Sequence, residues 1–311
     1  MSDIQLEILT PTFNRAKDLQ KNLSQLSSQV TGQGLTHAIS ISISDNCSED
    51  ETELVVINFK KKNPTIEVNY NRNSSNIGLE PNVLQLLKNA TAPYILWLGD
   101  DDYLAEGYLS FVLDKIKNND VGVIITGLAS LKKDGSVIVQ RDQSTPIYDF
   151  EAGYNSMLHY SHLAHQMSGL VVKREGLYEK YTQNAPYRNP YLFIFMAAES
   201  LLRHNGIYAP KFATQISDFN SKDWGYNKVG LLDEVFKSYY PFLEELGEEK
   251  VKRLLIRFSV LHSYRYNIDK FHPLRLFSQY RSLINEVPSL NQFKKELALQ
   301  LFKDYLLSWK K

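Results

Sequence analysis

Three consecutive aspartates, Asp100, Asp101 and Asp102, follow an apolar run at residues 94–98. Neighbouring carboxylates repel one another, so placing them at the end of a buried strand costs stability unless a cation sits among them. Asp100 and Asp102 have one residue between them and can project to the same side of an extended segment. Their oxygen atoms suit Mg²⁺ or Mn²⁺, which would be shared with phosphate oxygens. The structural alternative is a solvated acidic turn that caps the following helix.

Polar side chains also follow the other apolar runs of the first half. Residues 6–9 are followed by a segment that offers hydroxyl groups, a rigid proline, an aromatic ring, an amide and a guanidinium. These groups belong to Thr10, Pro11, Thr12, Phe13, Asn14 and Arg15. The next two runs, 37–44 and 66–70, are followed by Asp45 and Asn46, and by Arg72, Asn76 and Gly78. Taken singly, an acid behind a strand is often a turn former or a helix cap, and a lone arginine is often a surface residue.

The elements that must position these residues alternate along the first 127 residues. Strand patterns cover residues 6–9, 37–44, 66–70, 94–98 and 121–125. Helical spacing covers residues 16–26, 48–61, 81–89 and 105–118, and Ser48 with Glu51 predicts a capping box at the start of the second helix. This alternation indicates an α/β fold with a mostly parallel central sheet flanked by helices. Ligands of such sheets bind beyond the carboxyl ends of the strands, where the polar residues stand.

The pattern loosens after residue 128. Residues 132–135 predict a hairpin turn, residues 168–173 a further strand, and residues 190–204 a buried helix that ends at Asn205 and Gly206. From residue 224 onward the chain is predicted to be helical. The expected organisation is a catalytic domain over residues 1–222, with a first half at 1–105 and a second at 106–222, followed by a helical C-terminal region at 223–311.

Four segments together resemble the family 2 glycosyltransferases with the GT-A fold. They are residues 10–15 (TPTFNR), 45–50 (DNCSED), 76–79 (NIGL) and 98–102 (LGDDD). Their order and spacing match across roughly the first 105 residues, with weaker likeness to about residue 210. The GDDDYL form is closer to bacterial enzymes that build surface polysaccharides than to cellulose-type synthases.

The resemblance implies a nucleotide-sugar donor, a divalent metal (Mn²⁺ or Mg²⁺), and inversion at the anomeric carbon. The acceptor would be a saccharide or a lipid-linked saccharide. Carried onto this chain, the nucleotide would be bound by Pro11, Thr12, Phe13, Asn14, Arg15, Asp45, Arg72, Asn76, Gly78, Asp100 and Asp101. Asp100 would approach the ribose or the sugar, and the metal would be held by Asp102 together with Asp100.

The catalytic base departs from the family pattern. Inverting members often carry a Glu-Asp pair 11–12 residues before a glycine, but counting back from Gly206 gives Ile194 and Phe195. Glu199, one helical turn beyond Phe195, is therefore the predicted base, with Asp218 as a second candidate and Asp223 as a third. Pairing with Arg203 is the structural alternative for Glu199. His165 could face the acceptor, but a structural histidine is the better interpretation.

Composition limits the class of protein. The 311 residues carry 35 Lys or Arg and 35 Asp or Glu, with 43% hydrophobic residues, which is ordinary for a soluble globular protein. Cys47 is the single cysteine, which excludes an internal disulfide and a cysteine-built metal site. The start of the chain lacks the pattern of a secretory signal, and the longest apolar run, 191–198, is too short to span a bilayer. A cytoplasmic protein is expected.

The zero net charge conceals a segregation. Residues 250–311 hold thirteen Lys or Arg and four Asp or Glu, a balance of +9 that the remaining residues cancel. Because this segment is also rich in Phe, Tyr, Leu and Trp, three interpretations stay open. They are peripheral contact with the inner face of a membrane, a homo-oligomer interface, and simple packing onto the catalytic domain. Nucleic-acid binding is not expected, since no recognition motif accompanies the charge.

Two other functions remain as alternatives. One is a catalytically degenerate transferase that serves as a sugar-binding or scaffold subunit, suggested by the missing Glu-Asp pair. The other is a nucleotidyltransferase, although residues 10–16 lack the glycine-rich phosphate loop expected of one.

Overall fold

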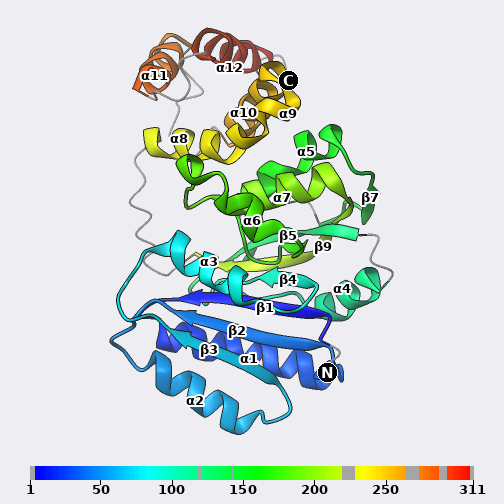
Figure 1. The fold of residues 1–311 in the computed structure, drawn as a ribbon. Coiled ribbons are helices and arrows are strands. Elements are labelled where there is room, and N and C mark those ends of the chain that lie inside the picture. Colours follow the sequence, from blue (N-terminus) through cyan, green and yellow to red (C-terminus); the bar gives the residue numbers. More distant parts are fainter. Residues whose placement is uncertain are drawn as a thin grey trace.

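The structure is a computed structural model that describes residues 4–117, 121–141, 143–218, 228–262, 273–286 and 293–308. Figure 1 shows one twisted sheet with helices on both faces and a further group of helices at the end opposite α1 and α2. The α/β architecture predicted from the strand–helix alternation is confirmed.

The first half alternates as expected. Four strands, β1 (Leu6–Thr12), β2 (Ile39–Asp45), β3 (Glu67–Arg72) and β4 (Tyr94–Trp97), lie parallel in the order β3-β2-β1-β4. The helices that follow them are α1 (Ala16–Gly32), α2 (Thr52–Lys62), α3 (Leu79–Asn89) and α4 (Tyr108–Ile116). The polar segments singled out in the sequence therefore lie at one edge of the sheet, either in the last residues of a strand, as Asp45 and Arg72 do, or directly after it.

The sheet is mixed beyond β4: its first four strands are parallel, as expected, and the later strands pair in both directions. β8 (Val171–Lys173) lies antiparallel between β4 and β5 (Val121–Leu131), and β9 (Asn205–Ser217) then runs parallel to β5. The short strands β6 (Val137–Val139) and β7 (Tyr148–Phe150) pair antiparallel with β5 and β9. β5 and β6 form the predicted hairpin, with its turn at residues 132–135.

β9 was not predicted, because a proline interrupts its pattern. The register between β5 and β9 shifts between Thr126 and Leu128, where Gly127 faces Pro210. A Cβ on Gly127 would lie 2.0 Å from the Pro210 carbonyl oxygen, so only glycine allows the strands to approach this closely.

The capping box predicted at Ser48 and Glu51 is wrong. α2 begins at Thr52, whose backbone N–H donates to the Asp50 carboxylate at 3.0 Å. The Ser48 hydroxyl accepts instead from the backbone N–H of Asn14, across the loop that follows β1. A tertiary contact has therefore taken the hydroxyl that a local cap would use.

Two apolar cores lie on the two faces of the sheet. One packs α1, α2 and α4 through residues such as Leu19, Val56 and Val112. The other packs α3 together with α5 (Tyr154–Tyr160), α6 (Leu177–Thr182) and α7 (Leu192–Arg203). α7 matches the buried helix predicted over residues 190–204.

The second core continues into the C-terminal helices. It includes buried side chains of α8 (Lys228–Tyr239), α10 (Glu248–Leu261) and α12 (Lys294–Ser308). Two more helices complete the described region, the short α9 (Leu243–Leu246) and α11 (Pro273–Glu286). The predicted boundary near residue 222 falls among residues 219–227, which are outside the described residues, and it stays a prediction. None of the helices in the described ranges has the length and apolar character needed to cross a bilayer.

Candidate active site

A cavity of about 700 Å³ opens at the carboxyl ends of β1 and β4. One wall is formed by the segments that the sequence singled out, residues 11–15, Asn46, Asn76, Gly78, Leu79 and residues 99–102. The opposite wall is formed by residues 165–167, which precede β8, and by Pro190, Tyr191 and Phe193 at the start of α7. The fold thus gathers residues from distant parts of the chain, as expected for a sheet of this kind.

The aspartate triplet is buried and held by an amide from α1. Asn22 donates to the backbone carbonyls of Gly99 at 3.0 Å and Asp102 at 2.6 Å. Asn22 is fully buried, so these bonds satisfy an amide donor that would otherwise be costly. The turn that carries the carboxylates is therefore fixed by the adjacent helix.

Asp102 is bound from two sides. Its Oδ2 accepts from the Ser168 hydroxyl at 2.5 Å, and its Oδ1 accepts from the backbone N–H of Ser217 at 3.3 Å. Ser168 precedes β8 and Ser217 ends β9, so two strands that the first 105 residues do not contain position this carboxylate. A Cβ on Gly99 would lie 2.9 Å from Asp102 Oδ2, so glycine is needed beside it.

Asp100 and Asp101 share one guanidinium. Arg15 donates to Asp101 Oδ2 at 2.7 Å and lies 3.9 Å from Asp100 Oδ1, while Thr12 donates its hydroxyl to Asp100 Oδ2 at 2.7 Å. Burial and the neighbouring Asp101 raise the pKa of Asp100 to about 7, against the opposing effects of Arg15 and Thr12. Burial alone would lower the pKa of Arg15, but the two carboxylates raise it.

The charge of the cavity is negative. Its described lining contains Asp18 and the three aspartates of the triplet against a single arginine, Arg15. A raised pKa for Asp100 is the expected response to such crowding when no further positive charge is near.

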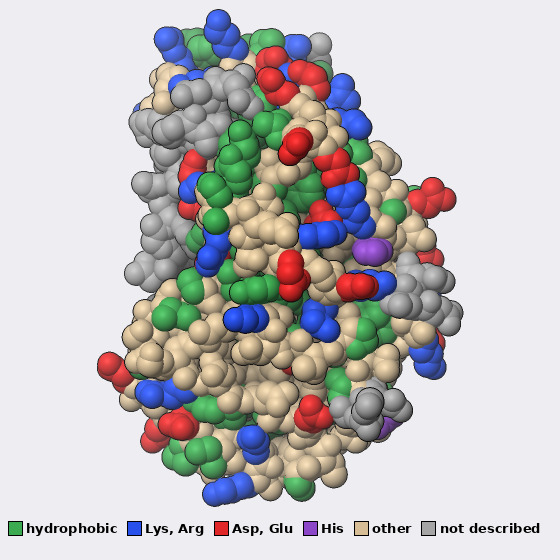
Figure 2. Space-filling view, in the orientation of Figure 1, with side chains coloured by type: hydrophobic (Ala, Val, Ile, Leu, Met, Phe, Trp, Pro, Cys, Tyr) green, Lys and Arg blue, Asp and Glu red, His purple; other side chains and the backbone are tan. Residues whose placement is uncertain are grey.

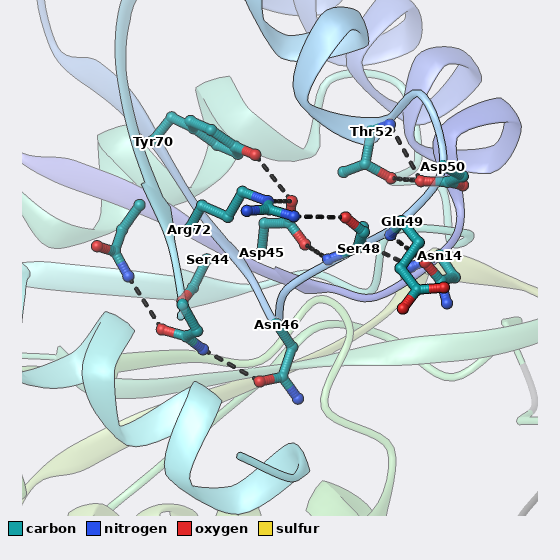
Figure 3. Close-up of polar contacts among 12 residues, drawn as sticks. Asn14, Ser44, Asp45, Asn46, Ser48, Glu49, Asp50, Thr52, Tyr70 and Arg72 are labelled. Carbon is teal, nitrogen blue, oxygen red and sulfur yellow. Dashed lines mark hydrogen bonds and ion pairs between the residues drawn. The ribbon is translucent and has the colours of Figure 1, made fainter. Parts of the chain in front are cut away.

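Asp45 lies behind the cavity wall and is not among the described residues that line it. Its carboxylate accepts from the Ser48 backbone N–H and the Tyr70 hydroxyl, both at 2.8 Å, and lies 3.8 Å from Arg72 Nε (Figure 3). Arg72 also donates to the Ser48 carbonyl at 2.9 Å. These bonds hold the loop over residues 46–50, so Asp45 and Arg72 shape the nucleotide-side wall from behind. Their predicted contact with the nucleotide stays a prediction.

The same loop is tied to the segment after β1. Asn14 donates its backbone N–H to the Ser48 hydroxyl, and its side-chain carbonyl accepts from the Glu49 N–H, both at 2.8 Å (Figure 3). Asn14 has a φ of 52°, a left-handed conformation that asparagine tolerates better than most residues. The predicted binding segment is thereby fixed by its neighbour.

Amides connect this wall to α3. Asn46 donates to the Asn76 side chain at 2.7 Å and accepts from the Ile77 N–H at 2.9 Å, and Asn76 in turn accepts from the Gly78 N–H. Asn76 and Gly78 line the cavity as predicted. Gly78, at a φ of 88°, turns the chain directly into α3.

An ion pair joins the two walls. Arg188, just before α7, donates from two nitrogens to the Glu80 carboxylate at 2.6 and 2.8 Å. Glu80 follows Leu79 in α3, and Arg188 precedes Pro190, so each partner adjoins a cavity-lining residue. The pair fixes the spacing between the walls.

The predicted bases lie away from the described cavity lining. Glu199 is buried on α7 and paired with Lys180 at 2.5 Å and with Arg203 at 3.1 Å. Asp218 follows β9, is about half exposed and pairs with Lys132. This geometry favours the structural alternative for Glu199, and the base role of both acids stays a prediction. Asp223 is outside the described residues.

His165 does line the cavity. Its Nδ1 lies 2.8 Å from the His162 carbonyl oxygen, which can only accept, so Nδ1 carries the proton and Nε2 has the lone pair in the neutral ring. The ring packs edge-on against Phe258 and His262, from α10 and the residue after it. His165 therefore combines the structural role expected for it with a place on the wall opposite the triplet.

The described residues contain no group of three or more His, Cys, Asp and Glu side chains arranged to hold a metal ion by themselves. Asp100 and Asp102 nevertheless offer oxygen atoms at the cavity, in a cluster whose repulsion a cation would relieve. The donor set fits an ion that completes its coordination with phosphate oxygens and water.

Sequence reasoning missed the residues that support the triplet. Asn22 is the one with a usable signal, because it interrupts the apolar stripe of Leu19, Leu23 and Leu26 on the buried face of α1. Ser168 and Ser217 gave no such signal, since their roles depend on how β8 and β9 enter the sheet.

Comparison with known proteins agrees with this geometry. Residues 7–181 match the model of the family described as glycosyl transferase family 2. A GalNAc(5)-diNAcBac-PP-undecaprenol beta-1,3-glucosyltransferase of Campylobacter jejuni is 29% identical over 133 residues, 43% of this chain and 40% of that protein. The abequosyltransferase RfbV of Salmonella typhimurium is 34% identical over 102 residues, 33% of this chain and 29% of that protein. The matches thus span well under half the length of these relatives.

Solved structures share the fold over nearly the whole chain. S. aureus TarS 1–349 in complex with UDP-GlcNAc superposes with a TM-score of 0.68 at 15% identity, covering 97% of this chain and 89% of that one. The mannosyltransferase PcManGT of Pyrobaculum calidifontis, in complex with GDP-Man and Mn²⁺, gives 0.57 at 15% identity, covering 98% and 82%. The family model covers more than half of the chain, and the chain therefore belongs to glycosyl transferase family 2, with the GT-A fold.

Proposed function

We propose that this protein is a glycosyltransferase that takes a sugar from a nucleotide-sugar donor and passes it to a saccharide or lipid-linked saccharide acceptor in bacterial surface polysaccharide synthesis. The observation that carries the proposal is the cavity itself. It brings a buried cluster of carboxylates, which a cation would stabilise, next to a wall of polar loops at the carboxyl ends of the strands. Relatives matched over part of their length are a glucosyltransferase and an abequosyltransferase.

The nucleotide half of the donor would lie against residues 11–15 and 76–79. Phe13 and Leu79 line the cavity with more than a third of each side chain exposed, which offers apolar area for a base. The polar groups of Asn14, Asn46 and Asn76 are close by, but they are mostly engaged with each other and with the loop. They would hold the wall in position more than they would bind the nucleotide directly.

A divalent cation, Mn²⁺ or Mg²⁺, would be held by Asp102 and Asp100. The argument is electrostatic: a cavity lined by four aspartates and one arginine repels a diphosphate, and Arg15 alone does not reverse that. When bound, the cation would stabilise the charge that develops on the departing nucleoside diphosphate. Asn22, Ser168 and Ser217 would keep the Asp102 carboxylate in place.

The acceptor would enter from the wall formed by residues 165–167 and 190–193. Direct displacement with inversion needs a group that takes the proton from the acceptor hydroxyl. Glu199 and Asp218 remain the predicted bases, and His165 joins them because it lines the cavity and has its lone pair on Nε2. The name of the Campylobacter relative contains a saccharide linked to PP-undecaprenol, which favours a lipid-linked acceptor.

Binding of nucleoside diphosphates in the presence and absence of Mn²⁺ tests the proposal. Thermal-shift measurements with a panel of UDP-, GDP-, CDP- and dTDP-sugars, at about 1 mM Mn²⁺, first identify the nucleotide. A ligand that binds only the folded state raises the melting temperature of the protein. We then expect Asp102→Asn to weaken Mn²⁺-dependent binding of that nucleoside diphosphate by about a hundredfold. Asp114→Asn, which changes an exposed acid of α4 that does not line the cavity, is the matched control and should bind within a few-fold of wild type.

Equal binding by wild type and Asp102→Asn with Mn²⁺ present would remove the metal assignment. Release of free sugar from the donor, or its transfer to an added acceptor, separates the enzyme from a degenerate binding subunit. Release of pyrophosphate from a nucleoside triphosphate and a sugar phosphate would identify a nucleotidyltransferase instead.

A further inference from the structure

The helices α11 and α12 pack side by side at the end of the molecule opposite α1 and α2 (Figure 1). The Phe277 and Phe302 rings meet edge to face at 5.8 Å between centroids. α12 follows α11 along the chain, and we call the pair the helical hairpin.

The inner side of this hairpin is well packed. Tyr280 of α11 and Leu297 and Leu301 of α12 are buried, and they belong to the same core as α8 and α10. The hairpin therefore packs on the rest of the molecule through its inner side. Its outer side is exposed although the inner side is fully packed.

The outer side carries both apolar and basic groups. Leu274 is 88% exposed, Leu307 60%, Leu306 46% and Phe277 45%. Around them, Arg275, Arg281 and Lys303 are also exposed. We call this set, residues 274, 275, 277, 281, 303, 306 and 307, the hairpin tip. In Figure 2 the end of the molecule where α11 and α12 lie shows Lys and Arg side chains beside hydrophobic ones, with Asp and Glu side chains also present.

We propose that the hairpin tip docks on an anionic lipid surface, with its leucines and Phe277 in the headgroup–acyl boundary and its basic side chains on lipid phosphates. Large exposed apolar side chains rimmed by charge are the features of interfacial helices. Lys and Arg side chains next to these apolar groups attract the protein to anionic lipid. Apolar insertion and electrostatic attraction together give stable binding. The segment 250–311 has a net charge of +9, which is opposite to the charge of an anionic lipid surface.

Charge argues against a second copy of the chain as the occupant. In a symmetric dimer the same patch meets itself, so the patch with Arg275, Arg281 and Lys303 would face a second patch of the same positive charge. A lipid surface instead supplies the opposite charge.

The hairpin is also placed suitably for the proposed reaction. α12 packs on α10, and Phe258 of α10 contacts His165 on the acceptor wall of the cavity. The hairpin is thus connected to that wall through the packed helix α10. The biological rationale rests on the proposed function, in which the acceptor is lipid-linked, but lipid binding itself is measured without any transfer.

Co-sedimentation of the full chain with vesicles tests the proposal. We expect binding to vesicles of phosphatidylcholine with 30% phosphatidylglycerol, weakened by salt, and about tenfold weaker binding to pure phosphatidylcholine. Leu274→Ser with Leu307→Ser should lower binding to the anionic vesicles by about tenfold or more. Arg275→Gln with Arg281→Gln should remove most of the preference for anionic lipid.

Leu54→Ser with Lys61→Gln is the matched control, because α2 carries an exposed leucine and lysine at the opposite end of the molecule (Figure 1). This variant should bind vesicles as wild type does. All variants should keep the wild-type melting temperature and the Mn²⁺-dependent nucleotide binding, so a failure of the proposed function shows separately from a failure of docking.

Equal binding to anionic and neutral vesicles, or unchanged binding by the hairpin variants, would overturn the proposal. So would a change from dimer to monomer on substituting Leu274 and Leu307 with vesicle binding intact, since a second copy would then be the occupant.

Discussion

Asp102 depends on its neighbours more than its place in an acidic triplet suggests. Ser168 and Ser217 donate to its two oxygens, Asn22 donates to its carbonyl, and Gly99 leaves it the room to lie where it does. The carboxylate is thus oriented before any ligand arrives, which removes part of the cost of binding a cation.

Gly99→Ala tests this orientation with a single added carbon. The new Cβ would meet Asp102 Oδ2 at 2.9 Å and Ser168 Oγ at 3.2 Å, so one of them must shift. We expect Mn²⁺-dependent nucleotide binding, measured by titration calorimetry, to fall by about tenfold or more while the chain stays folded. Gly32→Ala is the control, because a Cβ there meets nothing within 4 Å. Wild-type affinity in Gly99→Ala would show that the orientation of Asp102 is not required.

Glu199 and His165 give opposite predictions for the base. Glu199→Gln weakens the pairs with Lys180 and Arg203, so we expect it to lose about 1–2 kcal/mol of stability but to keep the transfer rate. His165→Gln should lower the transfer rate by about a hundredfold, with donor binding retained. Initial rates of transfer, together with urea unfolding, measure both. A large rate loss in Glu199→Gln at unchanged stability would return the base role to Glu199.

The element that joins the cavity to the C-terminal helices is the short 3-10 turn at Ser161–His165. His162 in this turn lies 3.1 Å, Nδ1 to Nε2, from His262, which follows α10. Burial, together with His262, Arg257 and Arg141, lowers the pKa of His162 to about 2. The acceptor wall is therefore tied to α10 through a histidine that is neutral in the folded state.

The pH dependence of stability follows from this pKa. The unfolded chain binds a proton at His162 below about pH 6.5 and the folded chain does not, so stability is full above that pH and falls as the pH drops. Between pH 7.5 and 5.5 the loss from this residue is about 1.4 kcal/mol. Urea unfolding should show a smaller loss over that interval in His162→Gln than in wild type. An unchanged slope in His162→Gln would contradict the assignment.

At this scale the sequence was most informative about the parallel half of the sheet. Each of its strands has a clear apolar pattern, and the polar residues behind β1 and β4 do meet at one cavity. Long-range pairing limited the rest. β9 was hidden by Pro210, and the cap at α2 was wrong because Ser48 bonds to Asn14 instead of to its own helix. Glu199 looked catalytic by spacing alone, since Lys180, which pairs with it, comes from another helix.

The C-terminal helices share an apolar core with one face of the sheet. Phe195 of α7 meets Phe242 at 5.3 Å between ring centroids, and Phe236 of α8 meets Phe293 at 5.8 Å. Val251, Leu254 and Phe258 of α10 are buried in the same core. The C-terminal helices therefore act as part of the body that holds the acceptor wall.

A single unfolding transition is the expected result. Phe258→Ala should cost about 3–5 kcal/mol, because its side chain is fully buried, and should shift the whole transition in a calorimetric scan. A chain ended at residue 222 should fail to give folded protein that binds nucleotide. Two separate transitions, with only one moved by Phe258→Ala, would instead support an independent C-terminal domain.

The packing divides the chain differently from the order of its motifs. α3 belongs to the first 105 residues but packs on the same face as α7, whereas α4 comes later and packs with α1 and α2. A hybrid enzyme that joins two relatives at residue 105 would combine α3 of one relative with α7 of the other, although the two helices share a core. A junction at residue 222 would separate α7 from α8 and α10 in the same way. Exchange of donor or acceptor preference between such enzymes is therefore better sought by grafting the side chains of one cavity wall, such as residues 165–167 and 190–193, onto an intact backbone.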